Sequence, residues 1–287
     1  MAVFKVVLLI AAVIFSIVAC GVAYCLIRYR TRGAAVEPRP VFGSPGIEIL
    51  WTVVPLMIVT GLFVITVRAM VAIDAPQESG QAADLIVTGH QWWWDARYPN
   101  GVVATEDIHI PVGRRLLVRV ESTDVIHDFW VPELARKMDA VPGRPSFIWL
   151  EADRPGTYMG ACSEFCGAQH AWMRFRVVAE PSAVFDAWLQ RQAESPAPAT
   201  GAAAEGERLF RTKKCSDCHA VASAKGPSLA HLASREFLGG GISQNTPANL
   251  ALWLTDPQAA KPGNRMPDTP LSANERDALL AYLESLK

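Results

Sequence analysis

The sequence predicts a multi-domain protein with an N-terminal transmembrane α-hairpin, an all-β domain and a C-terminal all-α domain. Three observations predict this fold class. Two long uncharged apolar runs lie near the N-terminus, short strand-like segments separated by turns fill the middle, and helical stretches surround a C-x-x-C-H motif near the C-terminus. We expect the hairpin at residues 1–75, the β-domain at 76–193, a linker at 194–204 and the helical domain at 205–287.

The apolar runs cover residues 6–27 and 49–67. Each is close to the ~20 residues that a helix needs to cross a hydrocarbon core of ~30 Å. A cleaved signal peptide is the alternative for the first run, but its apolar region is only about 7 to 15 residues long. The connection between the runs carries four arginines, against one lysine before the first run. Short basic loops stay in the cytoplasm, so both ends of the hairpin are expected outside it.

The middle of the chain, residues 85–178, alternates short β-branched and apolar segments with turns such as Pro99-Asn100-Gly101. This spacing is typical of a β-sandwich or barrel. A helix is expected over residues 182–192, where apolar side chains recur at helical spacing. The following segment, 194–204, is rich in Pro and Ala with small polar residues, which cannot build a core, and is expected to be a spacer.

The C-x-x-C-H motif at residues 215–219 is typical of covalent haem attachment. The thiols of Cys215 and Cys218 would add to the haem vinyl groups, and His219 would bind the iron from one face. A thioredoxin-like redox pair is the alternative, but the βαβ pattern that it needs does not flank this motif. A methionine is a common second axial ligand in electron carriers, and Met266 is in a suitable position. His231 is the competing ligand.

This C-terminal segment resembles small class I c-type cytochromes over its whole length. The resemblance rests on Gly226-Pro227 after the haem motif, on Met266-Pro267 and on a terminal helix containing Leu280-Ala281-Tyr282-Leu283. It implies one covalently bound haem c.

A second motif places Cys162, Cys166, His170 and Met173 within one segment of twelve residues. Soft sulfur ligands favour copper, and a weak Met ligand with His and Cys marks electron-transfer copper sites. Two cysteines could bridge two copper ions, each of which would need its own imidazole, and His127 is the natural second one. A structural zinc site, which has no use for the methionine, and a disulfide between the two cysteines are the alternatives.

Residues 1–193 resemble cytochrome c oxidase subunit II throughout, in the form that carries a fused C-terminal cytochrome. The resemblance rests on the cysteine segment and on four further motifs: Glu48-Ile49-Leu50-Trp51-Thr52, Gly89-His90-Gln91-Trp92-Trp93-Trp94, Val125-Ile126-His127 and Val141-Pro142-Gly143-Arg144. It implies a cupredoxin-like barrel that holds a dinuclear copper A centre.

The resemblance also implies the roles of individual residues. The copper ligands would be His127, Cys162, Cys166, His170, Met173 and the backbone carbonyl of Glu164. The Glu164 side chain would reach a magnesium ion at the subunit I interface. Trp92 would be the aromatic residue through which electrons reach the copper centre. Glu48 would lie near the mouth of a proton path, although a charge at the membrane boundary explains its position equally well.

The function that the resemblance implies is electron transfer in a bacterial inner-membrane haem-copper oxidase that translocates protons. All six histidines lie outside the apolar runs, so the oxygen-reducing site must belong to a partner, which the resemblance identifies as subunit I, with subunit III expected beside it. The donor would be a cytochrome c or another periplasmic carrier. The alternatives are a tethered electron shuttle without an oxidase, and a quinol oxidase subunit, which would lack the copper ligands. A net charge of −1 predicts no affinity for nucleic acid.

Overall fold

The computed structural model describes residues 2–30, 40, 42–74, 82–220 and 225–287 and divides the chain into two compact units, Met1–Asp74 and Ala75–Lys287. Two arginines of the expected cytoplasmic loop, Arg32 and Arg39, lie outside the described residues, as does the expected boundary at residues 75 and 76. The β-domain and the helical domain belong to one compact unit, so the boundaries between them stay predictions.

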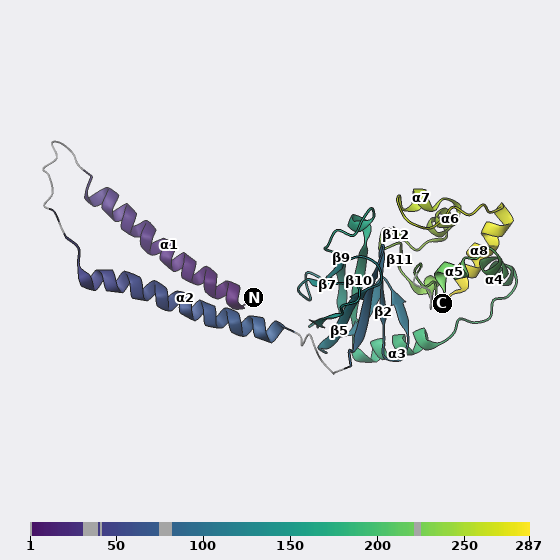
Figure 1. Ribbon diagram of the computed structural model, residues 1–287, viewed down its shortest axis with the longest axis horizontal. Coiled ribbons are helices and arrows are strands. Elements are labelled where there is room, and N and C mark those ends of the chain that lie inside the picture. The colour runs from purple at the N-terminus through teal and green to yellow at the C-terminus, as the bar shows by residue number, and fades with distance from the viewer. Residues whose placement is uncertain (1, 31–39, 41, 75–81, 221–224) are drawn as a thin grey trace. The chain divides into compact units, whose positions relative to one another are not determined.

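The first unit is a helical hairpin made of α1 (Ala2–Arg28) and α2 (Pro45–Ile73), which lie beside each other (Figure 1). Both helices are long and apolar enough to cross a membrane. α2 begins with a proline, whose missing N–H costs nothing in the first turn of a helix. Because α2 buries none of its side chains in this unit, its apolar surface needs another apolar environment. Glu48 lies in the first turn of α2, where its side chain is exposed.

The second unit begins with two five-stranded sheets. The first has the order β3-β2-β1-β5-β8 and the second the order β4-β10-β9-β6-β7. Their strands are β1 (Leu85–His90), β2 (Trp93–Arg97), β3 (Val103–Thr105), β4 (Asp107–Pro111), β5 (Leu116–Ser122), β6 (His127–Trp130), β7 (Met138–Ala140), β8 (Ser146–Leu150), β9 (Gly156–Cys162) and β10 (Arg174–Glu180). The all-β prediction for the middle of the chain is confirmed.

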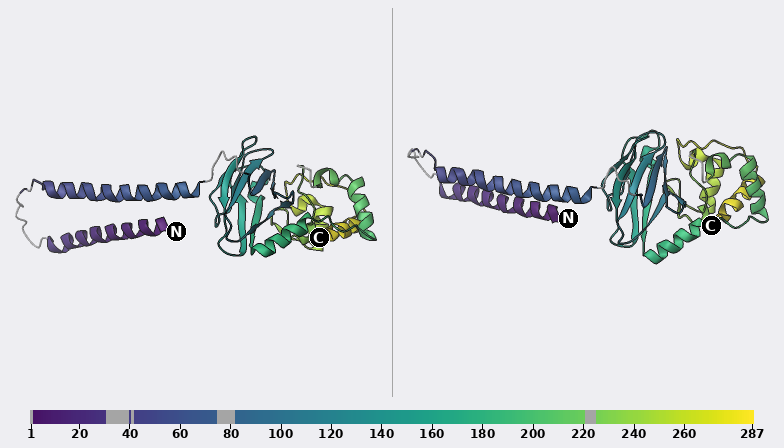
Figure 2. Two further views of the ribbon diagram at one scale, coloured as in Figure 1. Left: turned by 90° about the horizontal axis from the view of Figure 1, so that it is seen from below. Right: turned by 60° about the horizontal axis from the view of Figure 1, so that its bottom comes forward.

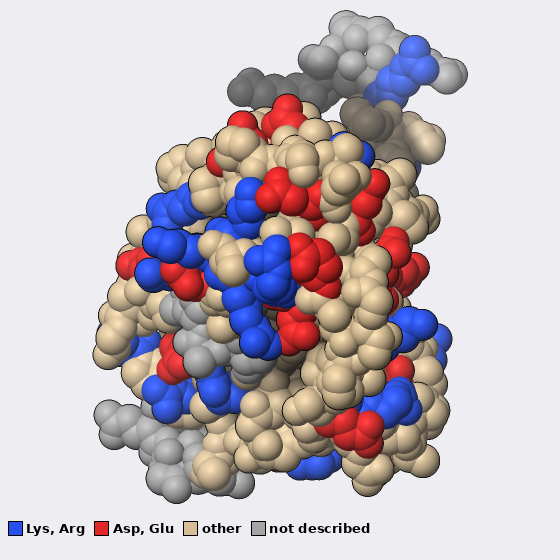
Figure 3. All heavy atoms as spheres, turned by 90° about the vertical axis from the view of Figure 1, so that its right-hand side faces the viewer, with Lys and Arg blue, Asp and Glu red and all other residues tan. Residues whose placement is uncertain are grey.

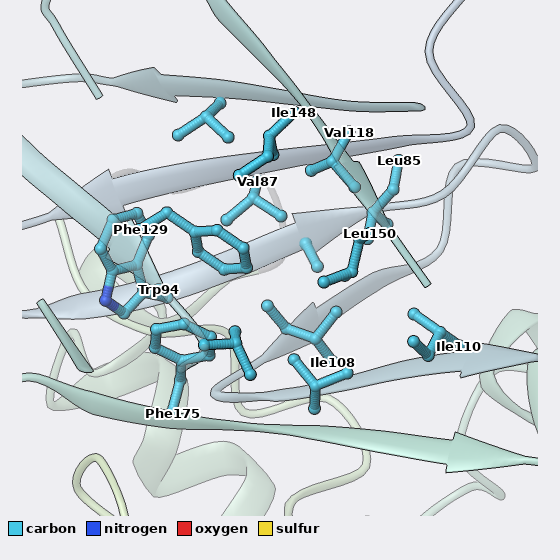
Figure 4. Packing of buried hydrophobic residues seen from close by; sticks show 14 of the residues in the cluster. Leu85, Val87, Trp94, Ile108, Ile110, Val118, Phe129, Ile148, Leu150 and Phe175 are labelled. Carbon is cyan, nitrogen blue, oxygen red and sulfur yellow. The ribbon is translucent and has the colours of Figure 1, made fainter. Parts of the chain in front are cut away.

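One apolar core lies between the two sheets (Figure 4). Its centre is aromatic: Trp94 packs against Phe129 and Phe175, and the last two rings stack with their centroids 4.7 Å apart. All three side chains are at most 1% exposed. Gly160 lets the Phe175 ring approach β9 directly, since a Cβ there would lie 2.3 Å from the ring. This core fixes the strands that carry the predicted ligands.

Strand pairing brings the two predicted ligand segments together. β6 begins at His127 and pairs with β9, with Phe129 opposite Cys162. The remaining predicted copper ligands follow in the connection from β9 to β10, which contains the short 3-10 helix η1 (His170–Trp172). A helix, α3 (Ser182–Ala193), follows β10 at the expected place and buries Phe185 against the core.

The C-terminal segment is mostly helical, and its helices gather beside the β-domain in both views of Figure 2. Helix α4 packs along α8, which begins with a capping box made by Ser272 and Glu275. The helices are α4 (Ala202–Thr212), α5 (Ser216–His219), η2 (Leu232–Ser234), α6 (Pro247–Thr255), α7 (Pro257–Ala260) and α8 (Ala273–Ser285).

Two details differ from the sequence-based expectation for this segment. α4 begins at Ala202, inside the expected 194–204 linker, because three consecutive alanines favour helix over spacer. The segment also contains a small hairpin of β11 (Phe237–Leu238) and β12 (Ser243–Gln244). Three glycines with positive φ, residues 239–241, make the turn between these strands, and the two-residue strands are too short to show as a period in the sequence.

Candidate functional site

Four sulfur and nitrogen ligands predicted from the sequence form a compact buried group. The Sγ atoms of Cys162 and Cys166 lie 3.7 Å apart, and the Cys166 Sγ is also 3.7 Å from the Met173 Sδ. The His127 Nδ1 is 3.9 Å from the Cys162 Sγ. His127 and Met173 are fully buried, at 0% exposure.

The arrangement is nearly symmetric about the two cysteines. On the other side of the pair, the His170 Nδ1 lies 3.6 Å from the Cys166 Sγ, so each sulfur has one imidazole nitrogen beside it. The third neighbour differs: Cys166 faces the Met173 thioether, whereas Cys162 faces the carbonyl oxygen of Glu164 at 3.2 Å. Two bridging sulfurs with one imidazole each would suit a pair of copper ions. A structural zinc site would leave the buried Met173 thioether without a role.

The cysteine pair is not a disulfide, because 3.7 Å is far from the bonded S–S distance of about 2.05 Å. A hydrogen bond from the Cys166 thiol, with another from His127, lowers the pKa of the Cys162 thiol well below its usual value. Thiolate is the form of cysteine that binds metals. The side chains present therefore fit a copper-binding group.

Asp124 supports the His127 side of this group. Its Oδ1 lies 2.8 Å from the His127 Nε2, which leaves Nδ1 facing the sulfur atoms. Metal-binding histidines usually donate their second ring N–H to such an acceptor. Burial disfavours the imidazolium, but hydrogen bonds with Cys162 and Asp124 outweigh it and raise the pKa of His127. Asp124 is not among the residues predicted from the sequence, although its position three residues before His127 is a usable signal.

The loop that holds the cysteines is contacted from the turn between β1 and β2. The carbonyl oxygen of Cys166 accepts hydrogen bonds from the Gln91 Nε2 at 2.7 Å and from the Trp92 Nε1 at 2.9 Å. Trp92 itself lies in the turn before β2, whereas Trp94 is in the core beside His127. Trp93 stacks on His90, with the ring centroids 3.8 Å apart. The structure therefore places Trp92, alone among the three tryptophans, on the backbone of a predicted copper ligand.

A second site is a pocket lined mostly by the helical segment and on one side by the β-domain, and Cys215, Cys218, His219 and Met266 all line it. The carbonyl of Pro227 lies 2.8 Å from the His219 Nδ1, so Nε2 is left for the pocket. Burial lowers the pKa of His219, which favours the neutral, ligating imidazole. His231 does not line this pocket; it is buried elsewhere, with its Nδ1 2.8 Å from the carbonyl of Lys287.

The pocket also fits a haem by its polar lining. The indole Nε1 of Trp253 is buried there without a hydrogen-bond partner among the described residues. Arg235 and the nearly inaccessible Lys261, 4% exposed, supply two cations. A haem carries two propionate carboxylates, which would satisfy such donors. In the described part of this segment the strands are only β11 and β12, so the βαβ unit of a thioredoxin-like redox pair is not found there.

Comparison with known proteins agrees with this geometry. A sequence profile described as "Cytochrome C oxidase subunit II, transmembrane domain" matches residues 1–69, and one described as "Cytochrome C oxidase subunit II, periplasmic domain" matches residues 102–180. A third, described as "Cytochrome c", matches residues 203–287. Cytochrome c oxidase subunit 2 of Alkalihalophilus pseudofirmus is 38% identical over 97% of this chain and 85% of its own length.

The chain belongs to the cytochrome c oxidase subunit II family. The corresponding proteins of Bacillus sp. strain PS3 and Bacillus subtilis are 34% and 30% identical, over 87% and 92% of this chain and 77% and 82% of their own lengths. The predicted fold class is confirmed: a transmembrane hairpin, a cupredoxin-like β-domain and a helical cytochrome c domain. The subunit is an inner-membrane protein with two spans, and it transfers electrons within an oxidase complex together with subunit I. Because these relatives are oxidase subunits, they do not favour the alternative of a membrane-tethered electron shuttle without an oxidase.

Proposed function

We propose that this subunit II accepts electrons at a covalent haem c, passes them to a dinuclear copper A centre and delivers them to the oxygen-reducing subunit I. The haem and the copper pair, when bound, would supply the one-electron carriers. The residues of the chain hold these groups, set their surroundings and determine how close together they lie.

The observation that carries this proposal is a short connection between the two sites. Gln91 and Trp92 both donate hydrogen bonds to the carbonyl of Cys166, and both also line the pocket that contains Met266. Arg265, the residue before Met266, bonds to the Gln91 side chain, and its guanidinium carbon lies 5.0 Å from the centre of a Trp92 ring. The β-domain therefore meets the predicted haem site at the aromatic residue assigned to electron transfer.

We assign the copper ligands to His127, Cys162, Cys166, His170, Met173 and the Glu164 carbonyl. Cys215 and Cys218 would bind haem covalently, and His219 and Met266 would hold its iron. The Glu164 side chain is exposed, so it is free to take part in a magnesium site with subunit I. We propose that Glu48, at the start of α2, lies at the entry of a proton path.

The surface beside the copper ligands supports docking on subunit I. Phe165, within the cysteine loop, is 77% exposed, and Ile126, next to His127, is 47% exposed. Large apolar side chains exposed together beside a functional site are typical of an interface. We place subunit III in the same complex on the family resemblance alone.

The face in view in Figure 3 mixes Lys and Arg side chains with Asp and Glu side chains. A surface of mixed sign gives weak electrostatic steering, so we propose a cytochrome c or another periplasmic carrier as the donor without a preferred charge.

The test is deletion of residues 196–287, which removes the haem domain and leaves the copper ligands. We expect donor oxidation to fall severely while the copper absorption remains. The control is the double substitution Cys20→Ser and Cys25→Ser, which changes cysteines on α1 and is expected to leave both properties unchanged. Unchanged turnover of the deletion variant would refute the proposed route.

A further inference from the structure

The most unusual charged group outside the two sites is Arg176 on β10. Its guanidinium makes a two-pronged pair with Asp107 on the neighbouring strand β4, at 2.9 Å and 2.7 Å. The remaining Nη1 donates to Glu236 of the helical segment at 2.7 Å. Its planar face lies over the Phe237 ring, 4.4 Å from the centroid. One side chain, 7% exposed, therefore joins the two redox domains.

Glu106, directly before Asp107, makes the second part of this junction. The residue is only 9% exposed, and its backbone carbonyl accepts from the Arg176 N–H at 2.8 Å. Burial raises the pKa of the Glu106 carboxyl group, and Lys261 and Arg235 of the helical segment oppose that rise. All three side chains line the same pocket, so an acidic group of the β-domain is buried beside two basic side chains of the helical segment.

Close packing surrounds these charges. A Cβ at Gly240, which has φ of +80°, would lie 2.9 Å from the carbonyl oxygen of Trp172, so only glycine fits against the β-domain there. The Gln169 side chain donates to the carbonyl of Pro262. Together with the contact of Arg265 with Trp92, these pairs join several separate segments of each domain. Such an arrangement indicates one preferred orientation, which a linker alone would not impose.

We propose that the two redox domains of this chain form a non-covalently stable pair in which Arg176 is the positioning residue. The linker gives only a high effective concentration, whereas the junction at Arg176 selects the one orientation in which Trp92 closes the haem pocket. It follows that a soluble donor meets the haem domain elsewhere and cannot use the Trp92 surface directly. This rests on the proposed function for the identity of the two redox groups, but not for the existence of the pair.

The experiment is to cut the linker of the purified, cofactor-loaded oxidase at a protease site inserted between Pro198 and Ala199, and then to follow haem absorbance by size exclusion. We expect the haem domain to co-elute with the rest of the oxidase at low salt. Arg176→Met is expected to release it at least about tenfold faster. Glu236→Gln leaves the pair of Arg176 with Asp107 intact and is expected to release it faster by a smaller factor, because the Glu236 side chain is 70% exposed. Arg208→Met is the matched control, because Arg208 is exposed and bonds within α4 to Glu205, and it should behave as the unaltered chain does.

Immediate release of the unaltered haem domain after cleavage would overturn the proposal, as would retention of both junction variants at the unaltered level. Flash reduction of the haem in the uncut chain provides the separate readout. If electrons still reach copper in the uncut chain while the cut domain falls away, the stable pair is refuted and the proposed function stands. If the domains stay together but no electrons pass, the proposed function fails and the pair stands.

Discussion

Asp124 gives the sharpest test of how the chain supports the copper site. Its carboxylate accepts from three groups: the His127 imidazole at 2.8 Å and the backbone N–H groups of Val125 and Gln91, each at 2.7 Å. Burial raises the pKa of Asp124, but these hydrogen bonds outweigh it and lower the pKa overall, so the group is a carboxylate at neutral pH. Asp124→Ala removes the acceptor that orients His127.

Loss of such a supporting acceptor typically costs 10–100-fold in metal affinity, or about 1.4–2.7 kcal/mol. The Asp124 side chain is 28% exposed, so water can replace part of what is lost. We therefore expect Asp124→Ala to weaken copper binding by about tenfold, at the lower end of this range. Asp124→Asn keeps an oxygen facing His127 and should weaken it by less.

The assay is competition for copper against a chelator of known affinity, with thermal unfolding of the copper-free protein as the control for folding. Glu121→Ala is the matched control, because Glu121 pairs with Arg119 at the surface and does not touch the ligands. Equal copper affinities for Asp124→Ala and the unaltered protein would refute the idea that Asp124 orients His127.

Three further predictions concern the haem site and the core of the β-domain. Cys215→Ser combined with Cys218→Ser should abolish haem staining on a denaturing gel, and staining that persists would exclude covalent attachment at these residues. Met266→Leu should lower the haem midpoint potential because it removes the thioether ligand, whereas His231→Gln should not shift it. Redox titration distinguishes the two variants. A shift only in the His231 variant would mean that His231, and not Met266, is the axial ligand. Gly160→Ala should lower the free energy of unfolding by about 1–3 kcal/mol, since its methyl group would clash with a buried aromatic ring, and an unchanged melting temperature would contradict this packing.

The ligand sets could be proposed from sequence because their spacing is local. Cys162 ends β9, and Cys166, His170 and Met173 follow it in the connection to β10. Cys215, Cys218 and His219 lie in one short stretch. Only His127 and Met266 lie far along the sequence from the other ligands of their sites. Each was the natural candidate of its chemical type in its region, so the structure added their geometry rather than their identity.

The contacts between domains could not be predicted in this way. Gln91 and Arg265 are 174 positions apart. Gln91 lies in one of the family motifs, but that motif does not indicate Arg265 as its partner. Arg176 and Glu106 look like ordinary strand and turn residues until their partners from the helical segment are in place. Such contacts depend on how two domains pack, which no local pattern encodes.

Electron paramagnetic resonance of the copper-loaded protein distinguishes a pair of copper ions held by Cys162 and Cys166 from a single copper ion. We expect hyperfine structure from one unpaired electron shared equally between two copper nuclei. A pattern from a single copper nucleus would contradict it, because the symmetric placement of His127 and His170 about the two sulfurs would then have no counterpart in the bound metal.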